Sequence, residues 1–176
     1  MNDMMNEEQQ TMKQTEPDET LRSGKKVEII FTEDDFLDLY PQTVVNIVSC
    51  TGIKRNSTNH RLAKAFPRYS QEYKRLCLRN GLRVAEPHVH DLGTLLGTQT
   101  VVSLPIKAHW KESLQPALVK RSIENLVQKI AELKTVSLAF PLFNGPPPDW
   151  IEKRFQEAFK KTPNLSLATL YLFKEV

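Results

Sequence analysis

Hydrophobic and polar positions alternate between two patterns along the chain: short apolar runs, which predict strands, and apolar residues three or four apart, which predict helices. Strands are expected at residues 27–31, 43–49, 88–92, 100–106, 135–143 and 165–173. Helical spacing covers residues 62–76, 113–133 and 147–159. Continuous apolar strands separated by amphipathic helices predict a three-layer α/β/α sandwich with a mostly parallel central sheet.

Proline and glycine residues predict where these elements begin and end. Pro67 should divide the first helical stretch into two pieces, and Gly81 is expected to cap the second piece. Ser113 is the expected N-cap of the next helix, with Pro116 in its first turn. Gly93 and Gly97 predict the turn between the expected strands at residues 88–92 and 100–106.

The first 25 residues differ in composition from the rest. They contain no aromatic residue, and six acidic against three basic residues, which gives them a net charge of −3. Because the whole chain carries +3, the remaining residues carry a net charge of +6. Such a segment buries too little apolar surface to offset the entropy of ordering, which predicts a disordered acidic tail at 1–25 and one domain at 26–176. A mildly basic domain suits an anionic ligand or nucleic acid.

Export and membrane insertion find no support in the sequence. No apolar run approaches the roughly 20 residues of a membrane span, and the N-terminus lacks the apolar core of a signal peptide. Cys50 and Cys77 are the only cysteines and are expected to be reduced thiols. The expected compartment is the cytoplasm, and no motif calls for a cofactor.

Two loops are the expected ligand site, because ligands of such sheets bind beyond the carboxyl ends of the strands. They are residues 50–59, which follow the second strand, and residues 143–149, which follow the fifth.

Three segments, read in order, resemble the macrodomains of the DarG type, antitoxins that remove ADP-ribose from DNA. They are VVNIVSCTGI with AKAFP in residues 44–67, SLPIKAHWK in 103–111, and AFPLFNGPPPDW in 139–150. The resemblance implies a macrodomain-like fold over about residues 27–172 and a site for ADP-ribose or a related adenine nucleotide.

The resemblance also implies roles for individual residues. The acid that binds the adenine amino group corresponds to Asp35, with Asp34 as an alternative one residue away, and Asn46 matches an asparagine near the ribose. Ser49 replaces a second asparagine. The remaining implied ligand-binding positions are Cys50, Gly52, Arg55, Ser57, Phe143, Asn144 and Gly145.

The lysine to which the family's hydrolytic activity is assigned falls on Asn56 in this sequence, and Lys54 is the nearest lysine that could replace it. The second loop has changed as well. Pro146, Pro147 and Pro148 have no N–H group, so the usual cradle of backbone amides around a diphosphate cannot form across them. Cationic and hydroxyl side chains in the first loop could hold phosphate instead, or could fill the cleft.

Other candidate groups have simpler explanations. His88 and His90 form a His-x-His pair without a Cys or Glu partner pattern, so we expect a surface pair and no metal site. Cys50 near His60 is better explained as a small buried residue than as a nucleophile. Lys107, His109 and Trp110 could form a basic and aromatic lip for nucleic acid, or Trp110 could be a half-buried anchor.

Three functions follow from these observations. The leading hypothesis is a macrodomain that binds ADP-ribose with reduced or no hydrolase activity. The second is an active hydrolase that removes ADP-ribose from DNA or protein, with ADP-ribosylated macromolecules as partners. The third is a non-catalytic protein-interaction module in which the cleft is closed.

Overall fold

A computed structural model describes residues 26–52 and 56–175, and the expected acidic tail at 1–25 lies outside them. The elements follow in the order β1 (Glu28–Thr32), β2 (Thr43–Ser49), α1 (Ser57–Ala65), α2 (Pro67–Leu78), β3 (His88–Asp91), β4 (Thr100–Lys107), α3 (Pro116–Glu132), β5 (Ser137–Leu142), α4 (Pro148–Lys160) and β6 (Thr169–Lys174). Each expected strand and helix is present, with ends that differ by a few residues.

The six strands form one sheet in the order β1-β6-β5-β2-β4-β3. All neighbours are parallel except β3, which pairs antiparallel with β4 through the predicted turn around Gly93 and Gly97. The central strand β2 is buried along its whole length, because β4 and β5 flank it and helices cover both of its faces. The predicted mostly parallel sheet is confirmed.

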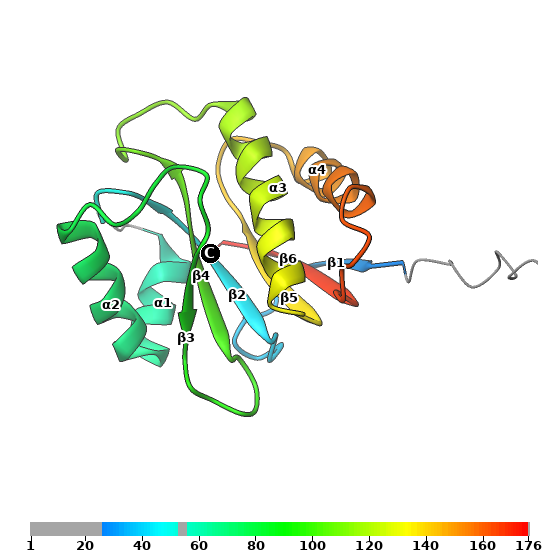
Figure 1. Ribbon diagram of the computed structural model, residues 1–176, viewed down its shortest axis with the longest axis horizontal. Coiled ribbons are helices and arrows are strands. Elements are labelled where there is room, and N and C mark those ends of the chain that lie inside the picture. Colours follow the sequence, from blue (N-terminus) through cyan, green and yellow to red (C-terminus); the bar gives the residue numbers. More distant parts are fainter. Residues whose placement is uncertain (1–25, 53–55, 176) are drawn as a thin grey trace, which may run out of the picture.

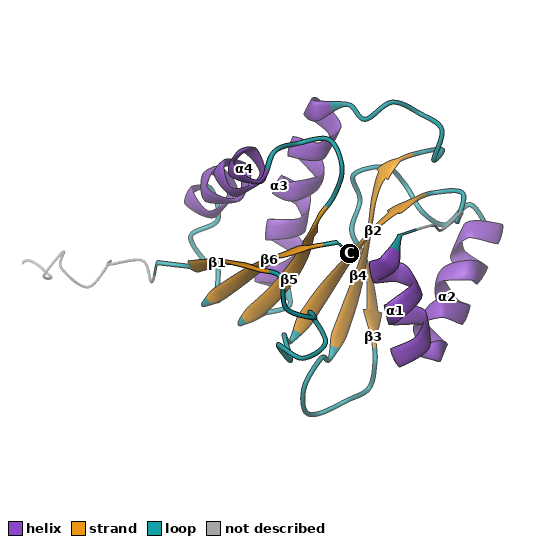
Figure 2. Ribbon diagram, turned by 180° about the vertical axis from the view of Figure 1, so that it is seen from behind, coloured by secondary structure: helices purple, strands orange, loops and turns teal. Residues whose placement is uncertain are grey.

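Helices cover both faces of the sheet, with α1 and α2 on one side and α3 and α4 on the other (Figures 1 and 2). Alternate strand residues divide between the two layers. Val45 and Ile47 belong to the core under α3 and α4, whereas Val44 and Val48 belong to the core under α1 and α2. The three-layer α/β/α sandwich is therefore confirmed.

Two of the predicted helix ends are wrong in detail. The N-cap of α3 is Gln115 and not Ser113, because Pro116 supplies the first helical residue and the chain before it is extended. At the end of α2 the left-handed residue is Asn80, with φ of 51°, and the Gly81 amide donates to the Leu76 carbonyl at 2.8 Å. Gly81 thus takes part in the C-terminal motif, one position beyond the left-handed residue.

The division of the first helical stretch at Pro67 is confirmed, since α2 begins at that residue. Among residues 26–52 and 56–175, no helix combines the length and the apolar character that crossing a bilayer requires.

Candidate functional site

A cleft lies where the carboxyl ends of β2, β4 and β5 meet. It consists of two adjoining hollows of about 420 Å³ and about 350 Å³, which share three lining residues. The first and second expected ligand loops both contribute to it. We call this the strand-tip cleft; it is lined by Ile47, Val48, Ser49, Asn56, Ser57, Asn59, Tyr73, Ile106, Lys107, Trp110, Leu114, Leu142, Phe143, Asn144, Pro146, Pro148, Lys174 and Glu175.

The first loop leads directly into α1, which begins earlier than the apolar spacing predicts. Asn56 is the N-cap: its Oδ1 accepts from the Asn59 amide at 2.8 Å, and its Nδ2 donates to the Ile47 carbonyl at 3.0 Å. The residue that we expected at the position of the family lysine is therefore a side chain that holds the helix start against β2. Lys54 and Arg55 lie outside the described residues.

Gly52 has a structural reason to be glycine. Its φ is +73°, and a Cβ at this position would lie 2.8 Å from Cys77 Sγ in α2. A side chain is thus excluded both by the backbone conformation and by the close approach of the loop to the helix.

Asn46 lies at the centre of a buried polar network rather than on the wall of the cleft. Its side chain is fully buried, and its Nδ2 donates to Asn59 Oδ1 at 3.1 Å and to the Tyr69 hydroxyl at 2.5 Å. Ser103 continues the network, 3.0 Å from the same hydroxyl. Asn59 lines the cleft, so Asn46 supports a lining residue from behind.

Asp35 lies beyond the end of β1 and forms an ion pair with Arg61 of α1. Its other oxygen accepts from the Leu37 amide at 3.0 Å. Asp34 instead accepts from the Thr32 hydroxyl at 2.9 Å in an exposed local turn. Of the two candidate acids, Asp35 is therefore the one that connects the β1 loop to the helical layer beside the cleft.

The second loop forms the opposite wall. Phe143 packs against the core, 6.2 Å between ring centroids from Phe140, and Asn144 follows it on the surface. Gly145 has φ of +130°, and a Cβ there would lie 2.8 Å from Leu114. Helix α4 then begins at Pro148 with Pro147 as its N-cap, so the prolines near the cleft offer no amide donor, as predicted.

The predicted lip residues lie together at the end of β4. Lys107 and Trp110 line the cleft, and Trp110 is 46% exposed. Its ring stacks on His109 with centroids 5.8 Å apart, and Lys111 Nζ lies 5.2 Å from the ring centroid. The result is an exposed aromatic surface bordered by positive charge.

Ser49 and Cys50 follow each other at the end of β2. Ser49 lines the cleft and its hydroxyl lies 3.0 Å from that of Thr51. Burial raises the pKa of the Cys50 thiol, and Cys77 and Glu112 raise it further. A raised pKa disfavours the nucleophilic thiolate, consistent with a packing role for Cys50.

The His-x-His pair differs from its prediction. His90 is buried, 1% exposed, where we expected a surface pair, and Glu72 of α2 supplies the acidic neighbour that the sequence pattern did not reveal. The pair shares one face of β3, as strand geometry requires, and that face is covered by α2.

Several residues of the site are missing from the sequence-based prediction. Asn59, Tyr73 and Leu114 line the cleft, and Arg61 pairs with Asp35. The Tyr73 hydroxyl donates to the Ser49 carbonyl at 3.2 Å, although its helical spacing indicated only a core position. The Asn56-x-x-Asn59 spacing is the one signal that could have revealed a helix cap at the loop.

Comparison with known proteins identifies the family. The sequence profile of the Macro domain matches residues 45–145, more than half of the chain. The chain belongs to the macrodomain family. The matched region contains both loops of the strand-tip cleft up to Gly145.

The relatives of this macrodomain include two DNA ADP-ribosyl glycohydrolases. That of Mycobacterium tuberculosis is 27% identical over 148 residues, 81% of this chain and 42% of the relative. That of Thermus aquaticus is 27% identical over 134 residues, 74% of this chain and 37% of the relative. This macrodomain therefore spans less than half the length of these two relatives.

Solved structures agree on the fold. The macrodomain of Thermus aquaticus DarG superposes with a TM-score of 0.71 at 25% identity and covers 84% of this chain and 99% of that one. The macrodomain of Mycobacterium tuberculosis DarG superposes with a TM-score of 0.72 at 23% identity and covers 82% of this chain and 98% of that one. Thermosipho africanus DarTG, solved in complex with ADP-ribose, superposes with a TM-score of 0.68 at 16% identity. The match covers 83% of this chain and 41% of that one.

Proposed function

We propose that this macrodomain binds ADP-ribose in the strand-tip cleft and has little or no hydrolase activity. The observation that carries the proposal is an open cleft, built by the two expected ligand loops, at the strand tips of a macrodomain. Its parts, of about 420 and 350 Å³, lie in the size range of pockets for small molecules. An open cleft disfavours the closed interaction module.

The surroundings of the cleft suit the parts of the ligand. Asp35 is not one of the lining residues, but its side chain is 26% exposed and its oxygens retain lone pairs beside Arg61, so it can accept from an adenine amino group. Lys107 supplies positive charge for phosphate, and the Asn56–Ser57 start of α1 supplies a helix N-terminus, which favours anions. Asn46 would act through Asn59, as a positioning residue.

The expected low activity follows from Asn56. An amide cannot act as a general base or as a nucleophilic amine, and both of its polar atoms are already bonded: Oδ1 caps α1, and Nδ2 donates to β2. The proline loop also removes amide donors that would otherwise stabilise a diphosphate.

Calorimetric titration of the full chain with ADP-ribose tests binding. We expect saturable binding that weakens roughly tenfold, or 1.4 kcal/mol, in Lys107→Ala and Phe143→Ala, which alter opposite walls. His60→Ala, on the exposed side of α1, is the matched control and should bind like the unmodified chain. Absence of heat from folded protein at millimolar ADP-ribose refutes the proposal.

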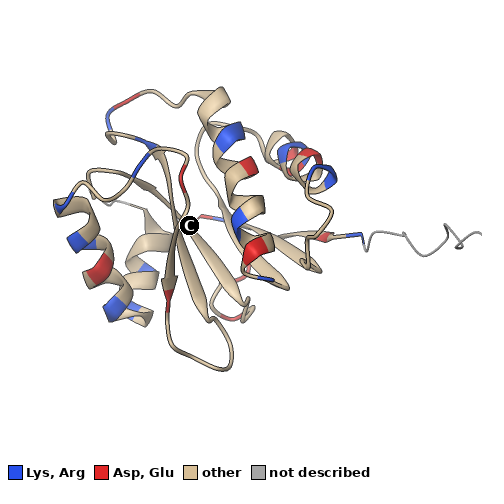
Figure 3. Ribbon diagram, viewed as in Figure 1, with Lys and Arg blue, Asp and Glu red and all other residues tan. Residues whose placement is uncertain are grey.

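A second function, removal of ADP-ribose from DNA, is favoured by the charge of the α1/α2 layer. Those two helices carry five basic residues and one acidic residue, whereas α3 and α4 carry six basic and five acidic residues (Figure 3). A basic layer beside the lip of Lys107, His109 and Trp110 suits a nucleic-acid strand, with a base stacked on Trp110. The named activity of the two relatives points the same way.

Incubation with ADP-ribosylated DNA separates the two functions. Binding without release of ADP-ribose supports the first proposal, and release supports the second. If ADP-ribose is released, loss of this release in the Lys54→Ala variant identifies Lys54 as the amine that the reaction requires. If it is not released, Asn56→Lys restores the family residue at that position, and a gain of release would show that this one side chain limits the activity.

A further inference from the structure

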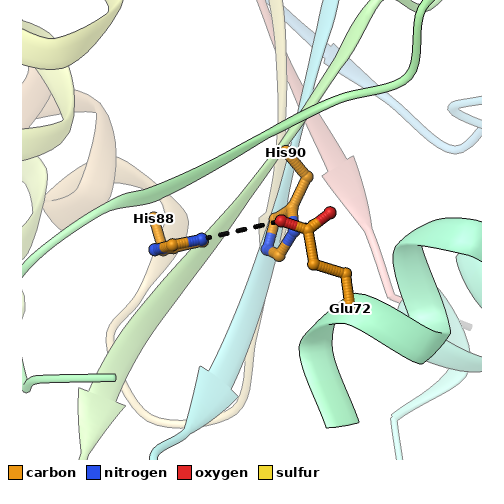
Figure 4. Close-up of side chains that lie close together, drawn as sticks. All are labelled: Glu72, His88 and His90. Carbon is orange, nitrogen blue, oxygen red and sulfur yellow. Dashed lines mark ion pairs between the residues drawn. The ribbon is translucent and has the colours of Figure 1, made fainter. Parts of the chain in front are cut away.

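Glu72, His88 and His90 meet between α2 and the edge strand β3, and none of them lines the strand-tip cleft. The two histidines project from one face of β3, and Glu72 projects from α2 toward them. Figure 4 shows the His88 ring directed at the Glu72 carboxylate, with the His90 ring beside it. One ligating atom from each residue lies within 4.8 Å of the others.

The separations approach those of a zinc site. Zinc bonds of about 2.0–2.2 Å in a tetrahedron place neighbouring ligand atoms about 3.4 Å apart. His90 Nδ1 lies 3.3 Å from Glu72 Oε2, and His88 Nε2 lies 4.0 Å from Glu72 Oε1. Because Glu72 and His88 are 50% and 35% exposed, small side-chain rotations can close the remaining gap.

The buried histidine is already oriented by a second bond. His90 Nε2 lies 3.0 Å from Ser103 Oγ, and Ser103 is in turn bonded to Tyr69. When Nε2–H donates to this hydroxyl, the lone pair of Nδ1 is directed to the Glu72 side. Metal-ligating histidines are commonly held by such a second bond on the other ring nitrogen.

Solvent reaches Glu72 and His90 through a hollow of about 510 Å³, which these two residues line together with Asp91, Arg68 and Arg75. The carboxylates favour a cation near the trio. The arginines favour an anion or water in the coordination position that three protein ligands leave open.

The geometry points to a divalent transition-metal site, with Zn²⁺ held by Glu72 Oε, His88 Nε2 and His90 Nδ1. Two imidazoles and one carboxylate are ligands that zinc accepts, whereas calcium and magnesium prefer oxygen alone. The site does not depend on ADP-ribose binding, because none of its three residues lines the strand-tip cleft.

Equilibrium dialysis of the full chain without a histidine tag against ZnCl₂ gives the stoichiometry, and CoCl₂ gives the d–d absorption of bound cobalt. We expect one ion per chain and cobalt bands typical of four- or five-fold coordination. Zn²⁺ should also raise the unfolding temperature, since it binds the folded state.

The variants are chosen at exposed positions, because replacing buried His90 could disrupt the fold. Glu72→Gln and His88→Ala should each weaken Zn²⁺ binding at least roughly tenfold, and the double variant should lose the cobalt bands and the thermal shift. His60→Ala removes an exposed histidine elsewhere on the helical layer and should bind Zn²⁺ unchanged. No saturable binding by the unmodified chain, or unchanged affinity in the folded double variant, overturns the proposal.

Discussion

On one face of the central sheet, β2 and β4 present Val45, Ile47, Val102 and Leu104 to α3 and α4. On the other face the same two strands present Asn46 and Ser103 to α1 and α2, and both polar side chains are fully buried. The first face is held by apolar burial, which has no directional requirement. The second combines an apolar core around Val44 and Val48 with a buried network of directional hydrogen bonds.

This difference bears on the two proposed sites. The network under α1 and α2 joins the cleft, through Asn59 and Asn46, to Tyr69, Ser103 and His90. Both proposed binding sites contact this layer, and the strand-tip cleft also reaches the core under α3 and α4 through Ile47, Ile106 and Phe143. Substitutions on the two faces should therefore have distinguishable effects.

The largest expected effect is a loss of stability on the apolar face. Leu126→Ala removes a fully buried side chain of α3 and should lower the free energy of unfolding by about 2–5 kcal/mol. Urea-induced unfolding measures it. Glu132→Ala, which breaks an exposed pair with Lys129, should change stability by less than about 1 kcal/mol. Equal losses in the two variants would contradict the packing described for α3.

On the polar face, Asn46→Ala should lower the free energy of unfolding by about 1–3 kcal/mol, because Asn59 and Tyr69 lose a buried donor. It should also weaken ADP-ribose binding, because Asn59 is no longer held at the cleft. Val44→Ala, on the same strand and face, is the control: it should destabilise the fold and leave the affinity measured by calorimetry unchanged. If both variants weaken binding alike, Asn46 has no positioning role.

Asn56→Ala removes the N-cap of α1 and should lower stability by about 0.5–2 kcal/mol in thermal or urea unfolding. Asn56→Ser keeps an oxygen that can accept from the Asn59 amide and loses only the donor to the Ile47 carbonyl, so it should lower stability less. A loss of stability in the Ser variant as large as in the Ala variant would argue against the cap as the role of this side chain.

The smallest expected effect is a change in how steeply the free energy of unfolding falls with pH under alkaline conditions. Burial raises the pKa of Tyr69 to about 12, from 10.0. Above pH 10 the unfolded chain loses this proton first, so stability is fully present below pH 10 and falls as the pH rises toward 12. In the Tyr69→Phe variant the free energy of unfolding should fall less steeply with rising pH. Urea unfolding at several pH values measures this. Burial also raises the pKa of Tyr73, so part of the fall should remain.

Much of the fold could be predicted from local pattern. The β2 and β4 runs and the break at Pro67 follow from apolar periodicity and from the missing proline amide, which act within a few residues. The bond from Asn56 to β2 and the burial of His90 could not be predicted in this way. Each depends on a partner brought by another element: Ile47 for Asn56, and Glu72 and Ser103 for His90.

The sequence by itself determined the order of strands and helices, the two loops at the strand tips and the loss of amide donors in Pro146–Pro148. These are consequences of backbone chemistry and of apolar spacing, which a chain carries wherever it lies in space. Only the tertiary structure decided that Asp35 pairs with Arg61, that Asn46 supports the cleft from behind, and that a glutamate of α2 joins the histidines of β3. Side-chain partners distant in sequence are selected by packing, because a buried polar group must find whichever donor or acceptor the fold places beside it.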